Sequence, residues 1–136
     1  MNEQLDLVIN DGGRSKYFSG KNVRDCVTRA IAIAAEKDYK EVYDYIFKFC
    51  GRTPRNGVLK KDAKKLMKVL GYKWVPLTFL GIGVKNHLRK NELPMDKRII
   101  CSCSGHFVAV INGKVHDTFD CRYNGNRAVY GYWIVK

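Results

Sequence analysis

Cys26 is the residue of this 136-residue chain best placed for nucleophilic chemistry, because a predicted helix begins at it. The apolar residues that follow recur at helical spacing (i, i+3, i+4, i+7): Val27, Ala30, Ile31 and Ala34. The free N–H groups of a first helical turn carry partial positive charge, which stabilises a thiolate. An isolated cysteine at a helix start is more often a small buried residue, so a nucleophile is expected only where a base lies nearby.

His106 and Asp117 are the candidate base and the carboxylate that orients it. Asn112-Gly113 is typical of a two-residue type I′ hairpin loop, and the resulting register puts Asp117 on the same sheet face as His106, one diagonal step away. His116 and Asp120 point to the other side. A carboxylate beside His106 would hold the imidazole tautomer and stabilise imidazolium. The alternative is that Asp117 simply ends the hairpin and His106 is a core histidine.

Periodicity and turn signals predict the elements that position these residues. Helices are expected over about residues 26–35, 39–50 and 59–70, and strands over about 5–9, 72–75, 98–101, 107–111, 114–119 and 130–135. Asp38, with Glu41 three residues on, predicts the start of the second helix, and Asn22 or Asp25 is expected to cap the first. Helices packed on a C-terminal antiparallel sheet predict an α+β fold in a single domain, residues 1–136.

Composition restricts the class of protein. No stretch of the sequence approaches the roughly 18 apolar residues of a membrane span, and the polar start MNEQLD does not resemble a signal peptide. The cysteine count of five is odd and the spacing is irregular, which favours free thiols in a reducing compartment. We therefore expect a cytoplasmic protein with no membrane partner; oligomeric state is not readable from the sequence.

A basic face is expected on the third helix. The chain has 25 Lys and Arg against 13 Asp and Glu, a net charge of +12. Five lysines fall on the polar side of this helix: Lys60, Lys61, Lys64, Lys65 and Lys68. A solvated face is the ordinary interpretation of such a run. The density of charge also predicts attraction to nucleic acid or to an acidic protein.

The order of a cysteine at a helix start, a histidine opening a strand and an aspartate on the next strand resembles the papain-like cysteine peptidase superfamily. The run Cys26-Val27-Thr28-Arg29-Ala30-Ile31 is similar to the nucleophile segment of ovarian-tumour-type deubiquitinases. Longer stretches look closest to small uncharacterised phage and bacterial proteins: Asp11-Gly12-Gly13-Arg14, Asp25-Cys26, Trp74-Val75-Pro76, His106 with Ala109-Val110, His116-Asp117-Thr118, and Val129-Tyr130-Gly131-Tyr132-Trp133. The resemblance implies a papain-like fold in a phage or prophage setting, with host cytoplasm as the location.

The resemblance also implies an activity. A thiol hydrolase (cysteine peptidase or isopeptidase) would act through a covalent thioester on Cys26, with His106 as base and then acid and Asp117 orienting it. Asn22 is the expected oxyanion-hole amide, alongside the backbone N–H of Cys26. The expected substrate is a protein or peptide, with no cofactor. A transferase or amidase on the same three residues, and a non-catalytic basic binding protein on the same fold, are the alternatives.

Other candidate sites are weaker. Cys101 and Cys103 with His106 lack the C-x₂₋₄-C spacing of structural zinc, so no metal site is expected. His87 is expected in a short helix after Gly83, as a surface or packing residue. Trp74 and Trp133 each sit in an alternating strand, which predicts that both are core residues.

Overall fold

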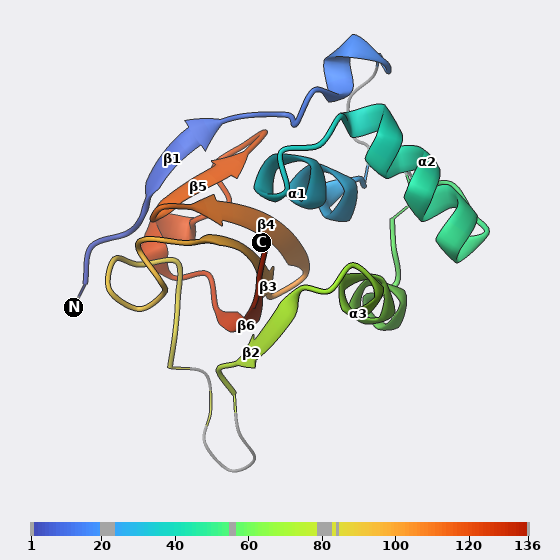
Figure 1. Ribbon diagram of the computed structural model, residues 1–136. Coiled ribbons are helices and arrows are strands. Elements are labelled where there is room, and N and C mark those ends of the chain that lie inside the picture. The colour runs from blue at the N-terminus through green and yellow to red at the C-terminus, as the bar shows by residue number, and fades with distance from the viewer. Residues whose placement is uncertain (1, 20–23, 55–56, 79–82, 84, 136) are drawn as a thin grey trace.

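The computed structural model describes residues 2–19, 24–54, 57–78, 83 and 85–135. The helices among them are α1 (Cys26–Ala34), α2 (Tyr39–Cys50) and α3 (Lys60–Val69), with short 3-10 turns η1 (Arg14–Lys16) and η3 (Tyr123–Gly125). The strands are β1 (Asp6–Ile9), β2 (Lys73–Pro76), β3 (Arg98–Cys103), β4 (His106–Ile111), β5 (Lys114–Asp117) and β6 (Val129–Ile134). Figure 1 shows the three helices gathered beside one face of the sheet. The α+β class is confirmed.

The described strands form one six-stranded sheet in the order β1-β5-β4-β3-β6-β2. The C-terminal strands β3 to β6 pair antiparallel, as expected, but the N-terminal β1 pairs with β5 in parallel and makes the whole sheet mixed. The other pairings are antiparallel. The pairing of β1 joins segments more than 100 residues apart, and local periodicity carries no information about the direction of so distant a partner.

The hairpin between β4 and β5 has the predicted register. Ile111 pairs with Lys114, and Ala109 with His116. Asn112 and Gly113 have φ values of 49° and 78°, which a type I′ loop requires. The β5 strand ends at Asp117, two residues earlier than expected, so Asp117 stands at the end of the sheet.

Both faces of the sheet are buried. On one face α1 packs through Ile31 against Ile100 of β3 and Ala109 of β4 in a single apolar cluster. On the opposite face, Val108 and Val110 pack with residues from segments outside the sheet, among them Leu5, Leu88 and Cys121. The alternation of β4 side chains between two apolar clusters explains why its sequence is apolar on both sides.

The helix ends follow the predicted signals in α2 but not in α1. Asp38 accepts a hydrogen bond from the N–H of Glu41 (3.3 Å), and Gly51 ends α2 with a φ of 71°. Asp25 stands at the N-cap position of α1 but makes no side-chain cap, because its carboxylate is taken by other partners. Asn22 lies outside the described residues.

Two further expectations were wrong. His87 lies in an isolated bridge with Ala128 instead of a helix. Trp133 is buried as predicted, but 37% of Trp74 is exposed. Because β2 is an edge strand, one side of Trp74 faces solvent while the other packs on Trp133.

All five cysteines are free thiols. None of the described helices combines the length and apolar character that a membrane crossing requires.

Candidate active site

His106 and Asp117 meet at the end of the β4–β5 hairpin. Nε2 of His106 lies 2.6 Å from Oδ2 of Asp117, and both side chains are almost fully buried. Burial by itself lowers the pKa of His106, but its hydrogen bonds to Asp117 and to Cys26 raise the pKa above the ordinary value of 6.5. Because Nε2 is held by Asp117, Nδ1 is the ring nitrogen left for the thiol.

Cys26 approaches this pair from the first turn of α1. Cys26, His106 and Phe107 line one hollow of about 560 Å³. Burial raises the pKa of Cys26, but the hydrogen bond and charge of His106, the N–H of Phe107 and the charge of Arg29 together lower it below its ordinary 9.0. The two shifts, downward for Cys26 and upward for His106, both move the pair toward thiolate and imidazolium.

The other four thiols have the opposite shift. Burial raises the pKa of Cys50, and it raises that of Cys101 well above 9.0. Burial also raises the pKa of Cys103 to about 12, and burial with the nearby Asp117 charge raises that of Cys121. Cys26 is therefore the one of the five thiols whose pKa is shifted downward.

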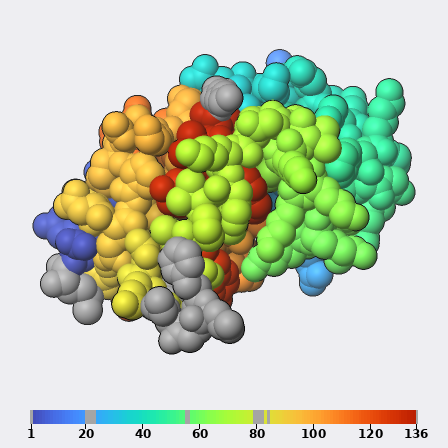
Figure 2. Space-filling model, turned by 60° about the horizontal axis from the view of Figure 1, so that its bottom comes forward, coloured from blue at the N-terminus to red at the C-terminus, as the bar shows by residue number. Residues whose placement is uncertain are grey.

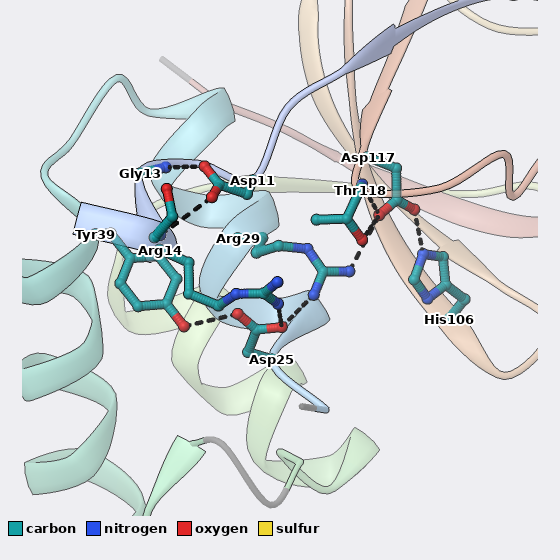
Figure 3. A network of polar contacts seen from close by, with 10 residues as sticks. Asp11, Gly13, Arg14, Asp25, Arg29, Tyr39, His106, Asp117 and Thr118 are labelled. Carbon is teal, nitrogen blue, oxygen red and sulfur yellow. Dashed lines mark hydrogen bonds and ion pairs between the residues drawn. The ribbon is translucent and has the colours of Figure 1, made fainter. Parts of the chain in front are cut away.

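A buried ionic network behind Asp117 was missed at the level of sequence. Arg29 lies in α1 and its guanidinium bridges two carboxylates, contacting Oδ1 of Asp25 and, at 3.1 Å, Oδ1 of Asp117 (Figure 3). Asp25 also accepts from Tyr39 Oη (2.7 Å) and Arg14 Nη1 (3.2 Å). The i, i+4 spacing of Asp25 and Arg29 was a readable signal for the first pair.

This network sets the position of the Asp117 carboxylate. Oδ1 accepts from Arg29 and from the N–H of Thr118 (2.7 Å), while Oδ2 faces His106. Burial raises the pKa of Asp117, but the bond to His106 and further hydrogen bonds lower it below 3.8. Asp117 is therefore ionised and held in one orientation toward the imidazole.

Phe119 and Lys60 are among the other residues that surround the pair. The Phe119 ring packs against the His106 ring with centroids 5.5 Å apart, although 47% of Phe119 is exposed. Lys60 lines the same hollow, so one of the five predicted lysines belongs to the site. The other four (Lys61, Lys64, Lys65 and Lys68) are exposed along α3 and lie outside this hollow.

The oxyanion-hole prediction stays a prediction, because Asn22 lies outside the described residues. Within them, the N–H of Phe107 is a backbone donor to the Cys26 sulfur. Asp120 is exposed and pairs with Arg122 at 2.8 Å, so it is not brought to the site, as the hairpin register predicts.

The residues that could hold a metal differ from those weighed in the sequence. His106, Asp117 and Cys121 offer donor atoms within 4.8 Å of one another, whereas Cys101 is not part of the group. A metal there would have to replace the proton between His106 and Asp117 and deprotonate Cys121, whose pKa is raised. A fourth ligand would also be needed for a structural zinc site. The hydrogen-bonded arrangement suits acid–base chemistry better.

Comparison with protein-family models, curated proteins and solved structures found no match to this chain.

Proposed function

We propose that this chain is a cysteine-dependent hydrolase that cleaves an amide or isopeptide bond, with Cys26 as nucleophile, His106 as base and acid, and Asp117 orienting the imidazole. The observation that carries this proposal is that Cys26 and His106 line one hollow while Nε2 of His106 lies 2.6 Å from the buried Asp117 carboxylate. The lowered pKa of Cys26 agrees with this geometry. The order of the three residues along helix, strand and next strand supports a distant place in the papain-like superfamily.

The proposed reaction begins from the ionised pair of Cys26 and His106. The Cys26 thiolate attacks the carbonyl carbon and forms a tetrahedral intermediate, which collapses to a thioester as imidazolium of His106 gives its proton to the leaving amine. His106 then removes a proton from water, which attacks the thioester and releases the acid and the thiol. Asp117 keeps the ring in place and stabilises its charge through both steps.

Arg29 is a positioning residue in this scheme. Its guanidinium contacts Asp117 on the oxygen that does not face His106. It also belongs to α1, the helix that begins at Cys26. One buried side chain therefore ties the helix that carries the nucleophile to the strand that carries the orienting carboxylate.

A non-catalytic binding protein on the same fold is the second candidate. The exposed lysines of α3 and the net charge of +12 favour it, because they attract anionic partners without any need for the thiol. The two candidates differ in what they require of Cys26.

Thiol labelling separates the two candidates. Iodoacetamide applied to the folded protein near neutral pH should modify Cys26 much faster than the other four cysteines, as read by peptide mass mapping over time. The His106→Ala variant is the matched comparison, and its Cys26 should react more slowly. Equal labelling of several cysteines, or a Cys26 rate unaffected by His106→Ala, would contradict the hydrolase proposal.

A further inference from the structure

The candidate active site opens toward two further hollows along α3. Lys60 lines both the hollow of about 560 Å³ that holds Cys26 and a second of about 410 Å³. Lys64 and Trp74 line the second and also a third of about 500 Å³. Because neighbouring hollows share side chains, we treat them as one substrate groove, running from Cys26 past Lys60 and Lys64 to Lys68.

Figure 2 looks onto this part of the surface. The green residues of α3 lie there beside the yellow-green residues of β2 and the red residues of β6. The substrate groove therefore lies between a helix and the edge of the sheet, and β2, which pairs with β6 and with no other described strand, forms part of that edge.

The charge in the substrate groove has one sign. None of the described residues that line the three hollows is an aspartate or a glutamate. No described carboxylate forms an ion pair with Lys60, Lys64 or Lys68. Three cations without counter-charges along a groove make a surface complementary to an acidic chain.

Aromatic and polar groups add to this surface. Trp74 is partly exposed and its ring centroid lies 4.4 Å from that of Trp133. The Lys60 ammonium lies over the Tyr130 ring at 5.0 Å. Ser102 lines the second hollow, and its buried hydroxyl has no hydrogen-bond partner among the described residues. An unsatisfied hydroxyl at that place points to a polar group supplied by a bound molecule.

We propose that the substrate groove binds an extended acidic segment of a polypeptide substrate and leads the acyl group of its scissile bond to Cys26. The inference rests on the proposed hydrolase function and names its substrate class. A polypeptide is favoured over nucleic acid because the groove ends at a thiol, and the proposed thiol chemistry acts on an acyl carbon, which a phosphodiester backbone lacks.

The spacing of the lysines defines the pattern of the segment. Lys60, Lys64 and Lys68 follow one another at i, i+4, a rise of about 6 Å per step along an α-helix. An extended peptide advances about 3.3 Å per residue, so every second side chain advances by about 6.6 Å on the same side. Acidic residues at alternate positions therefore match the three ammonium groups.

The test uses a fluorescein-labelled peptide of alternating Asp and Ala and the Cys26→Ala protein, so that binding is read by anisotropy without turnover. Two paired variants carry the same charge change on the same helix. Lys64→Glu with Lys68→Glu alters the groove, whereas Lys61→Glu with Lys65→Glu alters lysines that line none of the three hollows.

We expect the groove pair to weaken binding by about tenfold or more and the control pair by no more than about threefold, because only the first places like charges against the peptide. A peptide of the same composition with its aspartates in one block should bind the unaltered groove more weakly. Equal losses of peptide-binding affinity in the two paired variants would overturn the proposal. Tighter groove-dependent binding of single-stranded oligodeoxythymidine of equal charge would overturn it in favour of nucleic acid.

The outcome is separable from that of the proposed function. If Cys26 labels no faster than the other thiols while the peptide still binds through Lys64 and Lys68, the hydrolase proposal fails and a peptide-binding groove remains. If Cys26 labels selectively in all variants but the peptide does not distinguish the two lysine pairs, the substrate class alone is wrong.

Discussion

Replacing Arg29 by methionine should destabilise the folded protein by about 3 kcal/mol, because it breaks a buried ionic network and leaves carboxylates without their cation. The Arg29 side chain is 7% exposed, and those of Asp25 and Asp117 are 0% and 2% exposed. Methionine keeps most of the length of the side chain, so the loss of charge dominates over the loss of packing.

The expected loss lies at the low end of the range of about 3–5 kcal/mol for breaking a buried ion pair. Each carboxylate keeps other partners in the variant. Asp25 still accepts from Arg14 and Tyr39, and Asp117 still faces His106 and the N–H of Thr118. These remaining bonds limit the cost of the uncompensated charge.

Lys40→Met is the matched control. Lys40 pairs with Asp44 at the same i, i+4 spacing on α2, but both side chains are well exposed. Exposed helix pairs of this kind contribute about 0.3–0.5 kcal/mol. Urea unfolding followed by tryptophan fluorescence gives the free energy of unfolding of both variants and of the unaltered protein.

The pH dependence gives a second readout. The pKa of Asp117 is lower in the folded protein than in the unfolded chain. The partners of the ionised carboxylate therefore stabilise the fold when the pH is above the pKa that Asp117 has in the unfolded chain. This stabilisation is lost as the pH falls through the pKa that Asp117 has in the folded protein. Removing a cation 3.1 Å away raises that pKa again. The difference in free energy of unfolding between Arg29→Met and the unaltered protein should therefore become smaller below about pH 4. A loss no larger than that of Lys40→Met, or one independent of pH, would refute this reasoning.

Three further predictions concern the reacting residues. The alkylation rate of Cys26 should level off at a lower pH than the rate of an ordinary thiol, because His106 lowers the pKa of Cys26. In His106→Ala the pH profile of the rate should move to higher pH. Stopped-time labelling across pH measures both profiles, and coincident profiles would contradict the prediction. Asp117→Asn should slow Cys26 alkylation at neutral pH by about tenfold, because the pKa of His106 falls. The alkylation rate of Asp120→Asn, a change at an exposed residue, should stay within about twofold of the unaltered rate. A larger effect at Asp120 would mean that the assigned site is wrong. Cys26→Ala should abolish hydrolysis of any peptide substrate found. It should lower the free energy of unfolding in urea by less than about 1 kcal/mol. A larger loss of stability would favour a packing role for Cys26.

Local chemistry in the sequence determined much of the candidate site. The Asn112-Gly113 dipeptide sets the hairpin register because both residues adopt positive φ readily, and that register brings Asp117 near His106. Helical periodicity likewise put Cys26 in a first helical turn. Each of these depends on residues near one another in the chain, where turn geometry and the period of the backbone decide the outcome.

Only the tertiary structure decided how these local pieces meet. The sequence did not reveal that β1 pairs in parallel with β5, that Trp74 is left partly exposed on an edge strand, or that Arg29 reaches a carboxylate 88 residues away. The shift in the pKa of Cys26 has the same origin, because its sign depends on whether the charge of His106 outweighs burial. Burial and charge act through space, and the distances that set them exist only when the helices are packed on the sheet.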